Sequence, residues 1–140
     1  MTDANELLGA WRLESWSLVY DDGRPPEYPL GADAKGIIMY APDGHVSATL
    51  MRGGRAVSAP TSLEERATAY AESFAYAGRY RLEAGTVYHL IEIATNPALI
   101  GLTSTRHIAR DGDRLTLSGP DFSAGSSRTQ QIVWRRAPVA

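Results

Sequence analysis

The strongest indication of the fold in this chain comes from Leu8-Gly9-Ala10-Trp11-Arg12-Leu13-Glu14-Ser15-Trp16. Gly9 can adopt φ angles that other residues avoid, and the large indole of Trp11 follows two residues later. Trp11 begins a run whose side chains would alternate between the two faces of a strand. In the predicted strand, the odd-numbered residues 11–19 share one face and the even-numbered residues 12–20 share the other. Neither face is purely apolar. That pattern is typical of a barrel wall with a packed end and a partly polar interior.

If Trp11 points inward, an apolar patch remains on the outside of this first strand. Its members would be Trp16, Leu18 and Tyr20. Such a patch is expected to bury a helix or a second subunit, so a homodimer is one of the arrangements that the sequence leaves open.

The length, net charge and cysteine content of the chain exclude several classes of function. A chain of 140 residues makes one domain, residues 1–140, that can bury a core. A net charge of -2 argues against nucleic-acid or anionic-membrane partners. The absence of cysteine excludes disulfides, thiolate catalysis and zinc–thiolate sites. Residues 1–6 lack leader features, and no apolar run approaches the roughly 20 residues of a membrane span, so we expect a cytoplasmic protein.

The first half of the chain reads as a loop, a hairpin and a helix. Three prolines and two glycines make residues 21–31 irregular, a lid or a disordered flap. Strands are predicted at 36–40 and 45–52 around Pro42-Asp43-Gly44. Ser62-Leu63-Glu64-Glu65 fits a capping box. Helical spacing predicts an amphipathic helix that plugs or flanks the barrel and stops at Gly78; its apolar stripe is Leu63, Ala67, Tyr70, Phe74 and Ala77.

The second half reads as further hairpins. Strands are predicted at 79–83, 86–95, 103–110, 114–118 and 128–136, with a Gly/Ser-rich loop at 119–127. The total is eight antiparallel strands with one inserted helix. The simplest closed arrangement without an edge is an all-β, eight-stranded, up-and-down barrel.

Several stretches resemble the small bacterial lipocalin-like domain family, between about residues 7 and 136. They are Leu7-Leu8-Gly9-Ala10-Trp11-Arg12-Leu13, Gly36-Ile37-Ile38-Met39-Tyr40, Pro42-Asp43-Gly44-His45, Tyr76-Ala77-Gly78-Arg79-Tyr80, His89-Leu90-Ile91-Glu92, Arg106 and Gly112-Asp113-Arg114-Leu115-Thr116-Leu117. The resemblance implies a lipocalin-like barrel with a cavity for a small, fairly apolar molecule. Similar barrels in bacterial natural-product pathways act as cofactor-free cyclases or isomerases. It also implies that Arg135 or Arg136 covers Trp11, a structural contact.

Two residues of one strand and one of the next could carry acid–base chemistry. His89 and Glu92 are three apart, so they point to opposite faces unless a bulge intervenes. One of them would be an acid or base inside the barrel; otherwise His89 is a hydrogen-bonded wall residue and Glu92 half of an ion pair. A register pairing Glu92 with Arg106 would form an Arg–carboxylate fork, whereas a shift by one residue would separate them. Arg106 is then a structural charge or the anchor for a substrate enolate or carboxylate.

The other candidates are polar residues of the predicted cavity wall. His45 shares a strand face with Ser47, Thr49 and Met51, a mixture that suits such a wall. Phenols can donate to a developing oxyanion, or simply fill the barrel; the candidates are Tyr40, Tyr76, Tyr80 and Tyr88.

Three functions follow from these residues. The first is a cofactor-independent enzyme acting on a small hydrophobic molecule, with His89, Glu92, Arg106 and His45 as catalytic candidates. The second is a carrier that binds a small apolar ligand unchanged. The third is a barrel filled by its own side chains, which Ser15 and Ser17 argue against. No metal site is predicted, because His45, His89 and His107 lie on separate strands or opposite faces, and no cofactor motif is present.

Overall fold

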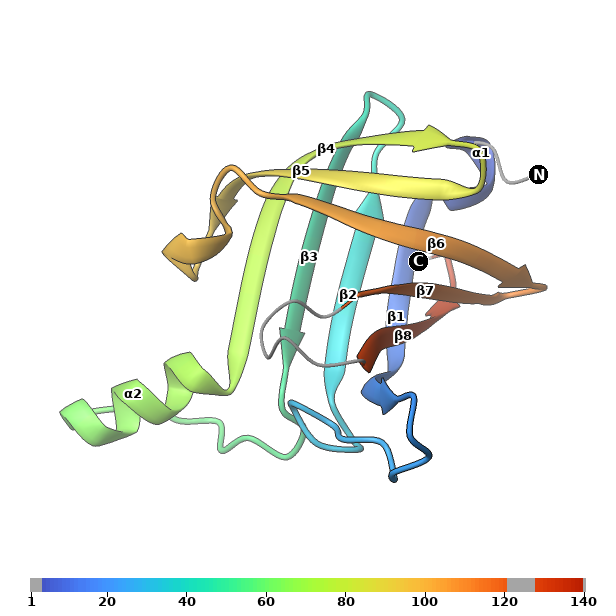
Figure 1. Ribbon diagram of the computed structural model, residues 1–140. Coiled ribbons are helices and arrows are strands. Elements are labelled where there is room, and N and C mark those ends of the chain that lie inside the picture. Colours follow the sequence, from blue (N-terminus) through green and yellow to red (C-terminus); the bar gives the residue numbers. More distant parts are fainter. Residues whose placement is uncertain (1–3, 121–127, 140) are drawn as a thin grey trace.

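The computed structural model describes residues 4–120 and 128–139, and the prediction for residues 121–127 lies outside them. The eight strands form a closed barrel in sequence order, each antiparallel to the next (Figure 1). The predicted eight-stranded up-and-down barrel with an inserted helix is therefore confirmed. The elements are α1 (Ala4–Leu7), β1 (Gly9–Tyr20), β2 (Lys35–Tyr40), β3 (His45–Met51), α2 (Leu63–Ala71), β4 (Ser73–Glu83), β5 (Thr86–Ala94), the 3-10 turn η1 (Pro97–Leu99), β6 (Thr103–Asp111), β7 (Arg114–Pro120) and β8 (Arg128–Arg136).

A bulge in β1 overturns the predicted faces of the first strand. Its register against β8 shifts between Leu13 and Ser15, so Glu14 is an extra residue and the alternation changes phase. Trp16 and Leu18 consequently follow Leu13 on the inner side and line hollows of the barrel. The predicted apolar patch on the outside of β1 is therefore absent, and it no longer supports a second subunit. Ser15 and Ser17 do not share the inner face with Trp11, so they do not account for the space inside the barrel.

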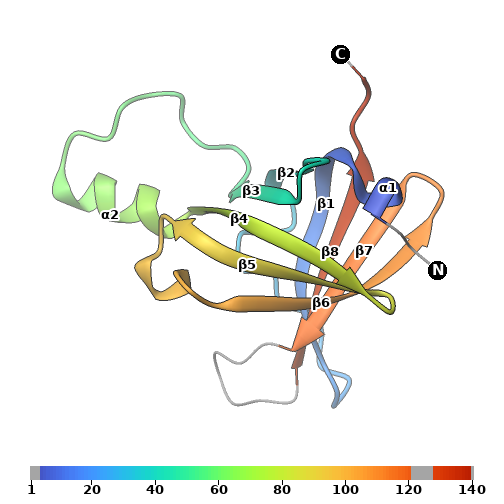
Figure 2. The same ribbon diagram turned by 90° about the horizontal axis from the view of Figure 1, so that it is seen from above.

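The helix α2 is shorter than predicted and does not plug the barrel. The capping box is present, since Ser62 accepts from the Glu65 amide and the Glu65 side chain from the Ser62 amide. The helix ends at Ala71, and the residues predicted for its last turns belong to β4. None of its residues is buried, and it extends away from the barrel wall (Figures 1 and 2). Phe74 fits the helical spacing of three and four residues, but it also fits the spacing of two in a strand. In β4 it packs against the core together with Tyr76 and Tyr80.

Gly78 is a strand residue instead of a helix stop. The register between β4 and β5 shifts here, with Glu92 as the extra residue of β5. A Cβ at Gly78 would overlap the carbonyl oxygen of Leu90, so the close approach of the two strands requires glycine.

The loop after β1 packs against the end of the barrel. Leu18 and Glu27 exchange backbone hydrogen bonds of 2.8 and 3.0 Å. Leu30 and Ala34 then insert into the core. Residues 21–31 were predicted to form a lid or a flap, and in the structure Leu30 anchors the last part of this segment in the core. In the described part of the chain, no helix has the length and apolarity to cross a membrane.

The interior is filled at the end near α1. Trp11 is fully buried, and its indole nitrogen donates to the Leu7 carbonyl oxygen at 3.0 Å. The Arg136 guanidinium lies 4.0 Å from the centre of the Trp11 ring. The Trp–Arg contact is thus made by Arg136, whereas Arg135 pairs with Glu14 at 2.7 Å.

Candidate functional site

A cavity of about 620 Å³ occupies the other end of the barrel. Its walls are mainly apolar, and the end of α2 and the η1 segment lie at its rim. Polar groups converge on it from three neighbouring strands: Tyr76 from β4, His89 from β5 and Arg106 from β6. The apolar part of the wall includes Trp16, Ile38, Leu50, Phe74, Ile91, Leu117, Ile132 and Trp134.

His89 lies at the centre of a hydrogen-bonded trio. Strand β5 turns Val87, His89 and Ile91 inward, and all three are buried. The His89 Nε2 atom lies 2.7 Å from the Tyr40 hydroxyl, and Nδ1 lies 2.8 Å from the Tyr76 hydroxyl. With 1 % of its surface exposed, the imidazole has both ring nitrogens satisfied by phenols.

Burial keeps all three groups of the trio uncharged at neutral pH. Desolvation, with a smaller contribution from the positive Arg106, lowers the pKa of His89 to about 3. Desolvation raises the pKa of Tyr76 to about 12, although the charge of Arg106 acts in the opposite direction. The pKa of Tyr40 is raised well above its usual value, chiefly by burial. The site therefore offers neutral hydrogen-bonding groups beside one permanent cation.

Arg106 gives the cavity its charge. It lies opposite Val87 in the β5–β6 register, on the inner face, and its Nη1 donates to the Thr105 carbonyl at 2.8 Å. Among the described residues that line the cavity there is no carboxylate, and Arg106 is the one charged side chain. Arg106 thus places a positive charge at the cavity wall.

Glu92 is not part of this site. The observed register does not pair it with Arg106, and its carboxylate lies outside, 3.5 Å from Arg79 Nε and half exposed. The bulge at Glu92 does not carry its side chain inward, because Ile91 keeps the inner position. Of the two roles considered for Glu92, an acid or base inside the barrel and half of an ion pair, the structure shows the ion pair.

The candidates on β3 lie on its outer face. Val46, Ala48 and Leu50 are the buried residues of this strand. His45 instead pairs with Asp43 at 3.0 Å on the surface, and Ser47 and Met51 alternate with the inward residues. The mixed composition that suggested a cavity wall belongs to an outer barrel face.

The four tyrosines occupy four different environments. Tyr76 lines the cavity, and Tyr40 lies behind His89 with 2 % of its surface exposed. Tyr80 packs edge-on against Tyr40, with ring centres 4.9 Å apart, and its hydroxyl donates to the Ala41 carbonyl at 2.9 Å. Tyr88 lies outside, with the Arg81 guanidinium 4.1 Å from its ring centre.

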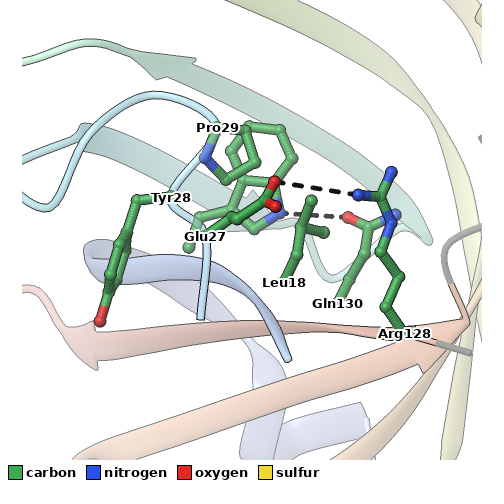
Figure 3. Close-up of a pocket in the computed structure, with 7 residues that line it drawn as sticks. Leu18, Glu27, Tyr28, Pro29, Arg128 and Gln130 are labelled. Atoms are coloured by element: carbon green, nitrogen blue, oxygen red, sulfur yellow. Dashed lines mark hydrogen bonds and ion pairs between the residues drawn. The ribbon is translucent and has the colours of Figure 1, made fainter. Parts of the chain in front are cut away.

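Sequence reasoning missed a hydrogen-bonded pair, Trp16 and Gln130, that lies between the cavity and a second hollow. The Trp16 indole nitrogen donates to Gln130 Oε1 at 3.1 Å, and both residues line the cavity and also a second hollow of about 350 Å³. Figure 3 shows that second hollow, with Glu27 and Arg128 paired at 3.9 Å across it. The alternation in β8 could have placed Gln130 inward beside Ile132 and Trp134, but the bulge in β1 hid the position of Trp16.

The fold and the site together define a class. A closed up-and-down barrel with one plugged end and one hollow, mostly apolar end is a small-molecule-binding barrel of the lipocalin type. The chain belongs to the lipocalin-like domain family, whose profile matches residues 8–137. A comparison with curated proteins gives no match. Within the described residues, no three potential metal ligands of the His, Cys, Asp and Glu types lie together.

Proposed function

We propose that this barrel is a cofactor-independent cyclase or isomerase for a small hydrophobic molecule. The observation that carries the proposal is the Tyr76–His89 pair beside Arg106 in an otherwise apolar cavity. A polar trio is expensive to bury, and a core of apolar residues would stabilise the barrel at least as well. Groups with strongly shifted pKa values that converge on a cavity are typical of functional sites.

The chemistry would rely on positioning and on stabilising negative charge. The cavity walls would hold the substrate in a reactive conformer. The Tyr76 hydroxyl would donate a hydrogen bond to an oxygen on which charge develops, while Arg106 would stabilise that charge. His89, whose Nδ1 contacts the Tyr76 hydroxyl, would hold the phenol in place.

The test begins with the bound molecule. Native mass spectrometry of freshly purified protein would identify a co-purifying small molecule, and its structural class would define the assay. In that assay, Tyr76→Phe should lower kcat about 100-fold, the scale of a lost oxyanion donor, and should weaken substrate binding by a smaller factor. The matched control is Tyr88→Phe on the outer face, which should leave kcat unchanged. Equal losses in binding and turnover for Tyr76→Phe would overturn the catalytic role.

One observation favours a carrier as the second candidate. The pKa of His89 is about 3 and that of Tyr76 about 12, so neither is matched to proton transfer near pH 7. A carrier would need these groups only to orient its ligand. Recovery of the bound molecule chemically unchanged after long incubation with the protein would support this candidate.

A further inference from the structure

We propose that Tyr40 fixes the direction of the hydrogen-bond chain Tyr40–His89–Tyr76, so that the chain ends in a hydroxyl hydrogen facing the cavity and selects a ligand with an anionic oxygen. This inference deepens the proposed function and rests on the binding of a small molecule in the cavity. It does not depend on whether that molecule is turned over.

The direction follows from counting hydrogens. A neutral imidazole carries one N–H group and one bare nitrogen. Both ring nitrogens of His89 contact a phenol, at 2.7 and 2.8 Å. One tyrosine must therefore donate to His89 while the other accepts from it. The accepting tyrosine is left with a hydroxyl hydrogen that needs a different acceptor.

The two tyrosines differ in what surrounds that hydrogen. The Tyr40 hydroxyl is buried, and among the described residues its hydrogen-bond partner is His89 alone. Tyr40 is also not one of the residues that line the cavity, whereas Tyr76 is. If Tyr40 accepted, its hydrogen would be buried without an acceptor, which is unfavourable. If Tyr40 donates, the free hydrogen belongs to Tyr76 and can reach the cavity.

The geometry thus assigns the tautomer of His89. Tyr40 donates to a bare Nε2, and Nδ1–H donates to the Tyr76 oxygen. Tyr40 is then a positioning residue: it never meets the ligand, but it determines which end of the chain carries the hydrogen.

The ligand class follows from the groups that the cavity presents. Tyr76 offers an O–H donor that faces the cavity, and the Arg106 guanidinium places a positive charge at the same wall. The matching ligand has an apolar body and one anionic oxygen group, a carboxylate or an enolate. A neutral group that is itself an N–H donor would meet donors and be disfavoured.

The first test measures the tautomer in the free protein. Long-range ¹H–¹⁵N spectra at pH 7 should show His89 with a protonated Nδ1 and a bare Nε2. In Tyr40→Phe, which removes the donor to Nε2, the single tautomer should be lost. A protonated Nε2 in the unmodified protein would overturn the inference, and this reading requires no variant to fold.

The second test measures the ligand class with a matched pair of probes. Naphthalene-2-carboxylate and naphthalene-2-carboxamide have nearly the same shape, and quenching of tryptophan fluorescence reports their binding because Trp16 and Trp134 line the cavity. The carboxylate should bind at least about tenfold more tightly, as expected for a charge-assisted hydrogen bond. Tyr76→Phe and Arg106→Met should each reduce that preference, and Tyr88→Phe should retain it.

The outcomes separate the two proposals. Equal binding of the two probes would overturn the inference on ligand class and leave the proposed small-molecule site intact. Failure of both probes to bind would count against the small-molecule site itself, and so against the proposed function. Preference for the amide would likewise overturn the inference on ligand class, while the direction of the chain is decided by the His89 tautomer of the first test.

Discussion

The two ends of this barrel use similar residues for opposite purposes. At the filled end, Trp11 occupies the axis and two arginines cover it, with the Arg110 guanidinium 5.1 Å and the Arg136 guanidinium 4.0 Å from the ring centre. At the hollow end, Trp16 and Trp134 stand in the wall and leave about 620 Å³ between them and the facing strands. An aromatic residue therefore closes a barrel or bounds a cavity according to where its strand position lies along the axis.

The arginines make the same contrast. Arg136 donates to the carbonyl oxygens of Leu8 and Glu6, and Arg110 also donates to that of Glu6. These bonds tie the helix α1 over the filled end. Arg106 instead lines the cavity at the hollow end. One end is therefore packed around Trp11, whereas the other encloses a cavity, and three measurements test this distinction.

The largest expected effect is on stability at the filled end. Trp11→Ala should lower the free energy of unfolding by about 3–5 kcal/mol, because it removes a fully buried indole from a site that α1 and the strands cannot refill. Trp16→Ala should cost clearly less, since Trp16 is half-buried and borders a space that already exists. Urea unfolding of both variants at pH 7 measures the difference. Equal losses would contradict a division between a filled and a hollow end.

The next effect is a pH dependence that originates at the hollow end. Burial lowers the pKa of His89 to about 3, so between pH 6.5 and 3 the unfolded chain binds a proton that the folded protein does not. Stability should therefore fall as the pH falls, by about 2 kcal/mol between pH 7.5 and 5 for one histidine with an unfolded pKa near 6.5. His89→Gln should remove that part of the dependence. The surface variant His45→Gln is the control and should retain it.

The smallest effect concerns the rim of the hollow end. Ser62→Ala removes the side-chain cap of α2 and should destabilise that helix by about 1 kcal/mol. Because no residue of α2 is buried, the global unfolding midpoint should barely move. Hydrogen exchange should show faster exchange confined to α2. A global loss of stability from this variant would mean that the helix supports the barrel after all.

The local signals in the chain predicted the fold well. The turn at Ala84–Gly85 has φ values of 50° and 81°, the left-handed pair of a two-residue hairpin, as its sequence indicated. The capping box at Ser62 and Glu65 was predicted from residues three apart. Each of these features depends on neighbours in the sequence, so it can be recognised without knowledge of the rest of the chain.

The candidate site was predicted only in part. His89, Tyr40, Tyr76 and Arg106 were all identified as candidates, and the structure brings them together at one cavity or directly behind it. Glu92, His45 and the other β3 residues were assigned by the same kind of argument and lie outside. The alternation in a strand says which residues share a face but does not say which face is inside.

Local patterns in the chain are enough to predict its class, an eight-stranded barrel plugged by a tryptophan, with polar residues available for its interior. The tertiary structure decided which of those residues meet. Two single-residue bulges, at Glu14 and Glu92, set the phase of the alternation, and the β5–β6 register placed Arg106 opposite Val87 instead of near Glu92. The physical reason is that a shift of one residue exchanges the two faces of a strand, and closure of the whole barrel selects the register.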